Sequence, residues 1–506
     1  MSFTTDSVRA LSLAICSIGL GWIAPTPAGA AGLLQPAVWP TVLSRPLPSS
    51  ARAVTIDLVT LKAVEAGDRI DLDLVLGDGA VETVVEAVTR RSPTSYSLLG
   101  RFDAEPDGFV LLAIEGDAVA GVIQLPVSYA GAPGGMASYI VQYVGDGVHE
   151  LSPAEPIEIA ECTTPDGTED DGADDGTQPW QGLLESSPLA GSCPAPRPNG
   201  DVMIYYTPAA RAEAGGTNAM DAECQLAVDT ANLTYADSQI TNRLRLVFRG
   251  EIAYTESGSS ETDRNRLKDT SDGFMDQVHS DRNVYGGDFV CLFLKNADAD
   301  ECGIAYCTPS GPSEGFCTVT WGCASSNFSF AHEIGHLQGC AHNRGDAGFG
   351  CNEFCYSYGY RFVGDSGSRW RTVMSYDTDP SSYTRIGRWS SPNVTFDGQP
   401  CGNWTGICTS SSAFNAATVE GTAYDREAWR DSRFDVWVDR FGTGTPRGTY
   451  QEPFRTVASG VAAVFSGGPT PAQPLLRIKS SSYAEAVVIS KALRMEACGG
   501  SVVIGN

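Results

Sequence analysis

Three of the five histidines in this 506-residue chain lie within eleven residues, at positions 332, 336 and 342. The first two are spaced i and i+4, so on a helix they share one face, with their Cβ atoms about 5–6 Å apart. Two imidazoles at that separation can bind one metal ion at about 2.0–2.1 Å, the length of a zinc–histidine bond. The spacing therefore predicts a helix from about 327 to 339 that carries His332 and His336 as metal ligands.

The third histidine can reach the same metal only if the helix ends sharply. Gly339 stands between His336 and His342, and glycine can adopt the positive φ that ends a helix and turns the chain back. Glu333 directly follows the first histidine, where its carboxylate can act on a water molecule at the open side of the metal. The motif predicts one catalytic Zn2+ held by the three histidines, with Glu333 as the general base.

A second segment strengthens this interpretation through resemblance to a known family. The motif 332–342 together with the turn 372–376 (Thr-Val-Met-Ser-Tyr) resembles the metzincin zinc endopeptidases, in which a Met-turn follows the metal-binding helix. The stretches 202–211, 242–246, 254–257 and 329–331 are similar to bacterial reprolysin-like and peptidyl-Asp metallopeptidases. The resemblance covers about 201–425.

The resemblance implies a twisted mixed sheet above a cleft, with the zinc-binding helix below it and a peptide bound beside the edge strand. It implies that Met374 forms the apolar floor beneath the three histidines. Tyr376 would either ligate zinc or stabilise the transition state, as in some metzincins, or else be an ordinary packing or surface tyrosine. One departure is Asn343, which stands where reprolysin-like enzymes usually have Asp after the third histidine.

The resemblance also implies protein or peptide substrates, with cleavage on the N-terminal side of Asp. Binding an acidic side chain would require a local basic pocket, because the net charge of the chain is −27. The arginines near the motif that could supply this pocket are Arg344, Arg369, Arg371 and Arg385.

Charge and cysteine content limit the partners and the compartment. A chain this acidic is not expected to bind nucleic acid or an anionic membrane through bulk electrostatics. Fifteen cysteines favour an oxidising compartment. Residues 1–30 are typical of a signal peptide, with an apolar stretch at 11–23 and an Ala-Gly-Ala cleavage pattern at 28–30. We expect an exported, bacterial-type protein without membrane insertion; the sequence does not indicate its oligomeric state.

The region before the motif divides into two parts. Residues 31–162 are predicted to form a β-rich pro-domain with strands at 70–76, 109–114 and 137–144, and with His149 on its surface. Residues 163–197 are predicted to be an acidic linker and activation region. A Ca2+ site in this acidic stretch is not supported, because the aspartates lack the spacing of a calcium loop. Cys162 could block zinc before activation or form a disulfide with Cys193.

The remaining chain is predicted to hold a catalytic domain at 198–440 and a C-terminal segment at 441–506. In the first we expect strands at 201–206, 244–254 and 288–294, helices at 218–237 and 263–284, and short edge strands at 303–306 and 317–321. The second resembles the opening of a right-handed parallel β-helix, with strands at 475–479, 487–490, 494–497 and 502–505. The fold class is therefore mixed α+β, with a metzincin-type sheet between a β-rich pro-domain and a short β-solenoid-like segment.

The predicted function is that of a secreted zinc endopeptidase made as a zymogen. The alternative is a catalytically silent, zinc-containing secreted adhesion or binding module, but the carboxylate of Glu333 argues against it, since such a module does not need a general base. We expect disulfides around the active site among Cys302, Cys307, Cys317, Cys323, Cys340, Cys351 and Cys355, and a local pair between Cys401 and Cys408.

Overall fold

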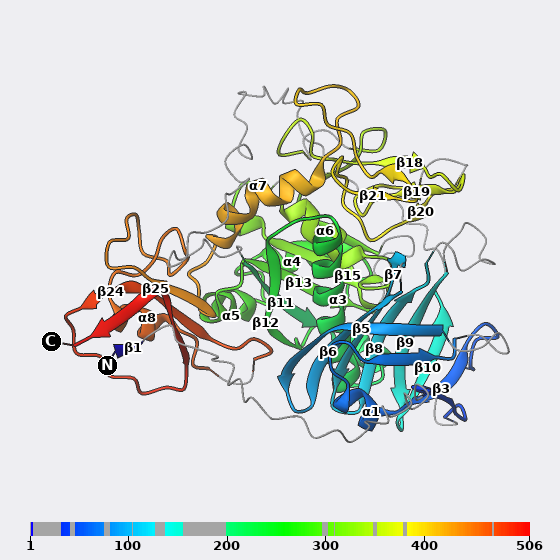
Figure 1. Cartoon of the computed structure of the whole chain (residues 1–506), viewed down its shortest axis with the longest axis horizontal. Coiled ribbons are helices and arrows are strands. Elements are labelled where there is room, and N and C mark those ends of the chain that lie inside the picture. Colours follow the sequence, from blue (N-terminus) through cyan, green and yellow to red (C-terminus); the bar gives the residue numbers. More distant parts are fainter. Residues whose placement is uncertain are drawn as a thin grey trace, which may run out of the picture.

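The computed structural model describes twelve stretches of the chain: residues 2–3, 32–40, 46–74, 81–103, 105–126, 137–154, 199–295, 302–307, 309–347, 352–377, 382–467 and 470–505. It is a mixed α+β structure in which a β-rich N-terminal part, a central sheet covered by helices and a C-terminal part lie side by side (Figure 1). No helix within these stretches is long and apolar enough to cross a membrane.

The N-terminal part is a nine-stranded antiparallel sheet with strand order β2-β3-β10-β9-β8-β7-β6-β5-β4 and one helix, α1 (Leu58–Ala63). The predicted strands at 109–114 and 137–144 are confirmed as β7 and β9. Of the strand predicted at 70–76, residues 70–72 belong to β4, residues 73–74 have no regular structure, and residues 75–76 lie outside the described residues. The strands are β2 (Leu34–Pro36), β3 (Arg52–Ile56), β4 (Arg69–Leu72), β5 (Val81–Ser92), β6 (Ser95–Phe102), β7 (Glu105–Glu115), β8 (Ala118–Gln124), β9 (Ser138–Gly145) and β10 (Val148–Pro153).

The central sheet has the order β12-β11-β13-β15-β14, in which β14 alone runs antiparallel to its neighbour. β13, and β11 from residue 202 onward, are runs of buried side chains without polar interruption, as expected for strands of a sheet that helices cover (Figure 1). Its strands are β11 (Asn199–Tyr206), β12 (Arg243–Glu251), β13 (Phe289–Leu294), β14 (Gly303–Ala305) and β15 (Phe316–Thr320), and its first helices are α2 (Pro208–Glu213), α3 (Thr217–Asp237), α4 (Ser260–Lys268) and α5 (Gln277–Tyr285).

Two sequence predictions for this part were wrong in detail. The helix expected at 263–284 is two helices, α4 and α5, because residues 269–276 form a Ser-, Asp- and Gly-containing turn between them. The segment 317–321 was expected to be an edge strand, but β15 lies inside the sheet and only β14 forms that edge. The apolar residues of β15 are buried on both faces of the strand. The hydrophobic pattern of only five residues does not distinguish such an interior strand from an edge strand.

The metal-motif helix α6 (Ser329–Leu337) packs beside the central sheet and against α3. Small strands and one long helix follow it: β16 (Ala341–Asn343), β17 (Tyr358–Gly359), β18 (Arg361–Val363), β19 (Arg369–Arg371), β20 (Thr384–Arg385), β21 (Thr395–Phe396), β22 (Gln399–Pro400) and α7 (Asn415–Glu427). β18, β19 and β20 form one sheet. This sheet lies at an edge of the molecule, next to β21, at the upper right of Figure 1.

The C-terminal part is built on three parallel strands, β23 (Asp435–Val438), β24 (Leu475–Tyr483) and β25 (Arg494–Ile504), with α8 (Val457–Ala463) packed on them and β1 (Ser2–Phe3) at the far edge. The strand expected at 475–479 is confirmed within β24. The two strands expected at 494–497 and 502–505 are one strand, β25, which ends at residue 504. The strand expected at 487–490 is absent from the described residues, where this segment has no regular structure.

The N-terminal sheet packs directly on helix α3 and shares its hydrophobic core. Buried side chains of β7 and β8, among them Phe109, Leu111 and Val122, belong to the same apolar cluster as Met220 of α3. On the other side, α3 contacts α6. The helix therefore lies between the N-terminal sheet and the metal-motif helix.

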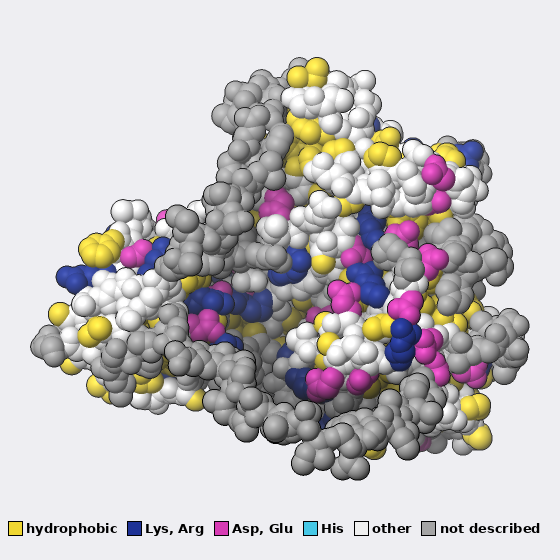
Figure 2. Space-filling view, in the orientation of Figure 1, with side chains coloured by type: hydrophobic (Ala, Val, Ile, Leu, Met, Phe, Trp, Pro, Cys, Tyr) yellow, Lys and Arg dark blue, Asp and Glu magenta, His cyan; other side chains and the backbone are white. Residues whose placement is uncertain are grey.

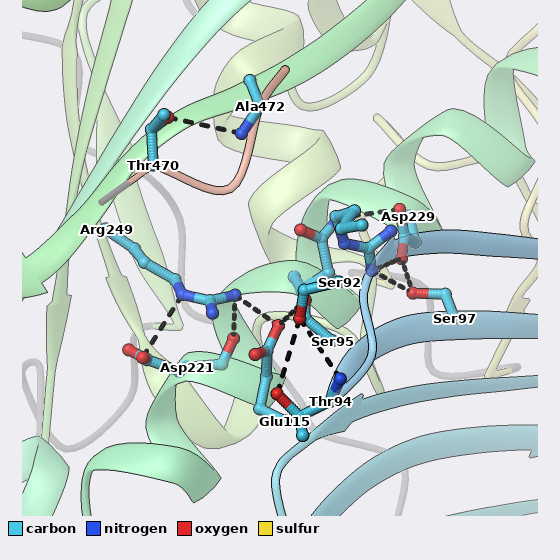
Figure 3. A network of polar contacts seen from close by, with 12 residues as sticks. Ser92, Thr94, Ser95, Ser97, Glu115, Asp221, Asp229, Arg249, Thr470 and Ala472 are labelled. Carbon is cyan, nitrogen blue, oxygen red and sulfur yellow. Dashed lines mark hydrogen bonds and ion pairs between the residues drawn. The ribbon is translucent and has the colours of Figure 1, made fainter. Parts of the chain in front are cut away.

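Ion pairs surround this shared core. Arg249 of β12 reaches Glu115 of β7 at 2.8 Å and Asp221 of α3 at 3.3 Å, as Figure 3 shows. Three more pairs link the two parts: Arg91–Asp229, Arg101–Asp237 and Arg388–Asp107. Basic and acidic side chains also lie next to one another on the face shown in Figure 2. Because several pairs are largely buried, removing one partner would leave a buried charge unpaired.

His149 was predicted to lie on the surface, and this was wrong. Its side chain is 1% exposed on β10, and its Nε2 accepts a hydrogen bond from the backbone N–H of Val119 at 3.1 Å. Burial lowers the pKa of His149 to about 4. The sequence of β10 does not show which face of the strand packs against other residues, so it could not predict the burial of His149.

The buried imidazole predicts a dependence of stability on pH. An unfolded histidine takes up a proton below about pH 6.5, whereas folded His149 does so only near pH 4, so folding loses stability as the pH falls through this window. We expect His149 to account for about 3 kcal/mol of this loss. In urea unfolding at pH 7 and pH 4.5, His149→Gln, which can still accept the Val119 bond, should show a smaller acid destabilisation; an equal loss in both proteins would contradict this assignment.

Candidate active site

Helix α6 presents His332 and His336 on one face, with their ring centroids 4.8 Å apart. The helix ends at Leu337 with Gln338 as its C-cap, and Gly339 follows with φ +88°, a conformation that residues with a Cβ rarely adopt. A Cβ on Gly339 would also lie 2.6 Å from the Cβ of Glu353. The glycine thus lets the chain turn into β16, which returns His342 to the other two imidazoles.

The Nε2 atoms of the three histidines converge. His342 Nε2 lies 3.2 Å from that of His332 and 2.9 Å from that of His336. Nitrogen ligands of a tetrahedral zinc ion, at about 2.0–2.1 Å from the metal, are about 3.3 Å apart. Among the described residues these three form the one cluster of potential metal ligands. The donor set and its spacing fit zinc.

Backbone groups orient the rings so that Nε2 faces the metal position. His332 Nδ1 lies 2.9 Å from the carbonyl oxygen of Val373, and His336 Nδ1 lies 2.9 Å from that of Cys340. His342 has a hydrogen bond to the backbone of Asp346. An Nδ1–H that donates to a carbonyl oxygen leaves the lone pair of Nε2 free for a metal.

The three imidazoles are held in the neutral form that binds metals. Burial lowers the pKa of His336 to about 4 and lowers the pKa values of His332 and His342 well below 6.5. The charge of Arg385 adds to the lowering of the pKa of both His332 and His342. Figure 2 accordingly shows no described histidine on the face that it draws.

Glu333 is buried, at 3% exposure, and its side chain lies against the edge strand β14. A Cβ on Gly303 of that strand would come within 2.9 Å of the Cγ and Oε1 atoms of Glu333. Glycine at this position therefore leaves room for the carboxylate between the metal helix and the edge of the central sheet.

Met374 and Trp389 pack against the opposite side of α6, at Gly335. A Cβ on Gly335 would lie 2.7 Å from both the Met374 Sδ and the Trp389 ring, so the glycine allows this close packing. Met374 is fully buried. The sequence singled out Met374, but nothing in it pointed to Trp389.

Tyr376 and Asn343 connect the Met-turn to the third histidine. The ring of Tyr376 lies 3.9 Å from that of His342, centroid to centroid, and 5.8 Å from that of His332. Asn343 Oδ1 accepts a hydrogen bond from the Tyr376 N–H at 2.9 Å, while its Nδ2 donates to Asp346 at 2.6 Å. The bond to Asp346 needs a donor at position 343. The amide of Asn343 supplies it, whereas the carboxylate of an aspartate at this position would repel that of Asp346.

The four arginines predicted for a basic pocket lie within the described residues. Arg344 stacks over the ring of Tyr358 at 3.9 Å, and Arg369 lies beside Tyr383 on the surface. Arg371 and Arg385 are buried beside Ser375. Cys162, the activation region 163–197 and all of the predicted signal peptide except residues 2–3 lie outside the residues that are described.

The prediction of disulfides around the active site is confirmed for Cys302, Cys307, Cys323 and Cys355 and is wrong for Cys317 and Cys340. Cys302 bonds Cys323, and Cys355 bonds Cys408. Cys401 is a buried free thiol, so the predicted Cys401–Cys408 pair is wrong; Cys355 is far away in sequence but lies beside Cys408 in the fold. Cys317 and Cys340 are free and buried in the apolar core. Cys307 is disulfide-bonded, and its Sγ lies 3.8 Å from His336 Nδ1, a neighbour that the sequence did not indicate.

Comparison with known proteins assigns the family. Residues 199–390 match the metallopeptidase family M12. A peptidyl-Asp metalloendopeptidase of Xanthomonas campestris pv. campestris is 30% identical over 402 residues, which cover 77% of this chain and 88% of that protein. The chain belongs to the M12 metallopeptidase family.

Other likenesses are shorter or weaker. A peptidyl-Asp metalloendopeptidase of Stenotrophomonas maltophilia (strain R551-3) is 38% identical over 229 residues, which cover 45% of this chain and about half, 52%, of that family member. One solved structure, described as the structure of a chaperone–substrate complex, is similar over 46% of this chain and 36% of its own, with a TM-score of 0.35 and 16% identity.

Proposed function

We propose that the protein is a zinc-dependent endopeptidase that cleaves proteins on the N-terminal side of Asp. The observation that carries this proposal is the convergence of three buried Nε2 atoms, with a buried carboxylate on the residue that follows the first histidine. Membership of the M12 family and the names of the relatives support it.

The roles of the residues follow from their chemistry. Zinc, when bound to His332, His336 and His342, supplies Lewis acidity and lowers the pKa of a water molecule. Glu333 accepts the proton of the attacking water and transfers it to the leaving amine. We assign to Tyr376, whose ring lies beside that of His342, the donation of a hydrogen bond to the developing oxyanion. Met374 supports the histidines from below the helix.

The proposal is tested with a denatured protein as substrate. The protein is incubated with it, with and without a zinc chelator, and the cut sites are mapped by mass spectrometry. Cuts that precede Asp and disappear with the chelator support the proposal. Absence of cleavage by the zinc-loaded protein, also after removal of the N-terminal region, would favour a binding module instead.

We also propose that the protein is exported and made as a zymogen, with activation by cleavage in 163–197. The disulfides Cys302–Cys323 and Cys355–Cys408 support an oxidising compartment. The N-terminal sheet packs on α3, whose other side contacts α6. The described part of the pro-domain would therefore support α3 on the side that does not contact α6.

This arrangement predicts that the pro-domain stays attached after the linker is cut. The apolar core that β7 and β8 share with α3, and the Arg249–Glu115 pair, are formed by residues outside the linker. After limited proteolysis in the linker, we expect the two fragments to elute together in size-exclusion chromatography at neutral pH. Glu115→Lys, which opposes two positive charges at this contact, should separate them; fragments of the wild-type chain that elute apart would refute the prediction.

A further inference from the structure

The third histidine of the cluster is held by a loop instead of a helix. His342 lies in β16, and the chain after this strand folds back, because the N–H groups of Asp346 and Ala347 both donate to the carbonyl oxygen of Asn343, at 2.8 and 2.9 Å. His342 in turn has a hydrogen bond to the backbone of Asp346. The orientation of this imidazole therefore depends on where the loop 343–347 places Asp346.

Two donors hold the side chain of Asp346. Its Oδ2 accepts a hydrogen bond from Asn343 Nδ2 at 2.6 Å and lies 3.5 Å from Arg361 Nη1 of β18. The side chain is 10% exposed, so its charge is largely removed from water and is compensated by the guanidinium group. Removal of either donor would leave a largely buried carboxylate incompletely paired, which favours a shift of the loop towards water.

The same asparagine also fastens the loop to the Met-turn. Asn343 Oδ1 accepts a hydrogen bond from the Tyr376 N–H at 2.9 Å, and Asn343 is the register partner of Gly359 in β17. A Cβ on Gly359 would lie 2.6 Å from Ser375 Oγ, so this strand pair packs directly on the Met-turn. One amide thus joins two segments, with its oxygen towards the Met-turn and its nitrogen towards Asp346.

We propose that Arg361, Asp346 and Asn343 form a polar chain that positions His342 for the metal. The inference rests on the zinc site of the function proposed above and adds the residues that hold its third ligand. Asp346 does not belong to the metal-ligand cluster, so the chain acts on the metal through the loop and the His342 ring. Partners that orient a ligand in this way change metal affinity by about 10–100-fold.

The test measures the zinc dissociation constant of the full chain by competition with a chromophoric chelator, which needs no cleavage. Asn343→Asp opposes two carboxylates and should raise the constant at least about tenfold. Asp346→Asn, which removes the charge that Arg361 pairs with, should also raise it about tenfold. The double variant exchanges the donor and acceptor groups, keeps the net charge and should bind zinc within about threefold of wild type.

The Co2+-loaded proteins provide a second readout. Their visible absorption depends on the geometry of the ligands. It should change in both single variants and return to the wild-type spectrum in the double variant, which a general loss of stability would not produce.

Asp435→Asn is the matched control. Asp435 has a similarly buried side chain, 9% exposed, and pairs with Arg477 at 2.8 Å in the C-terminal part. It is not in the metal-ligand cluster, so its removal should leave the zinc constant and the Co2+ spectrum unchanged.

Each outcome decides one point. Zinc constants within threefold of wild type in both single variants overturn the assignment, and so does a double variant that binds zinc no better than Asn343→Asp. If Asn343→Asp does not fold, Arg361→Gln, which leaves the Asn343–Asp346 bond intact, should raise the constant at least about threefold, and an unchanged constant again overturns it. A wild-type protein that binds zinc but cleaves no peptide refutes the peptidase proposal alone.

Discussion

Glu333→Gln is expected to reduce kcat/KM by at least about 1,000-fold while one zinc ion per chain is retained. Glutamine has the size and shape of glutamate, so the buried space against Gly303 stays filled. It cannot accept the proton of the attacking water, however, and the three histidines that would hold the metal are unchanged. The measurements are peptide-cleavage kinetics and zinc content of the same preparation.

Glu223→Gln provides the matched control for this substitution. Glu223 lies on α3, where it accepts a hydrogen bond from Ser325 Oγ at 2.6 Å, and it is not a member of the metal-ligand cluster. The control should retain activity within about threefold of wild type. Activity of Glu333→Gln within tenfold of wild type, a barrier change of only about 1.4 kcal/mol, would rule out Glu333 as the general base.

His336→Ala is expected to remove zinc and cleavage together. Its Nε2 lies 2.9 Å from that of His342, so it supplies one of the three converging ligand atoms. Two ligands hold zinc far more weakly than three, and we expect zinc content after dialysis to fall to a few per cent and activity to fall at least about 1,000-fold. Metal analysis and cleavage assays measure both quantities.

His279→Ala is the control for this second substitution. His279 lies on α5, where its Nε2 is 2.9 Å from the carbonyl oxygen of Asp269, and it is not part of the metal-ligand cluster. The His279→Ala protein should keep one zinc ion per chain and full activity. A His336→Ala protein that keeps stoichiometric zinc and cleaves at the wild-type rate would show that the ligands lie elsewhere.

The parts of the site that the sequence predicted are those fixed over short distances along the chain. His332 and His336 are one helical turn apart, and Gly339 ends that helix, so the i,i+4 rule and glycine's positive φ were enough to place them. The mixed α+β class and most strands of the N-terminal and central sheets were also predictable, because alternating or continuous apolar runs encode them locally.

The parts that the sequence did not predict depend on pairing between distant segments. The bond from Tyr376 to Asn343 arises only when the Met-turn packs beside β16, and the Cys355–Cys408 disulfide arises only from folding of the loops. His149 is buried because one particular face of β10 is covered. The packing of β7 and β8 on α3 likewise joins two regions that the acidic stretch separates in sequence.

The most direct test of the account is a zinc titration of the metal-free protein, with the rate of peptide cleavage followed at each addition. If the three histidines hold the catalytic metal, the rate rises in proportion to added zinc and reaches its plateau at one equivalent per chain. A protein that binds this one equivalent and cleaves no peptide, even after its linker has been cut, would contradict the account.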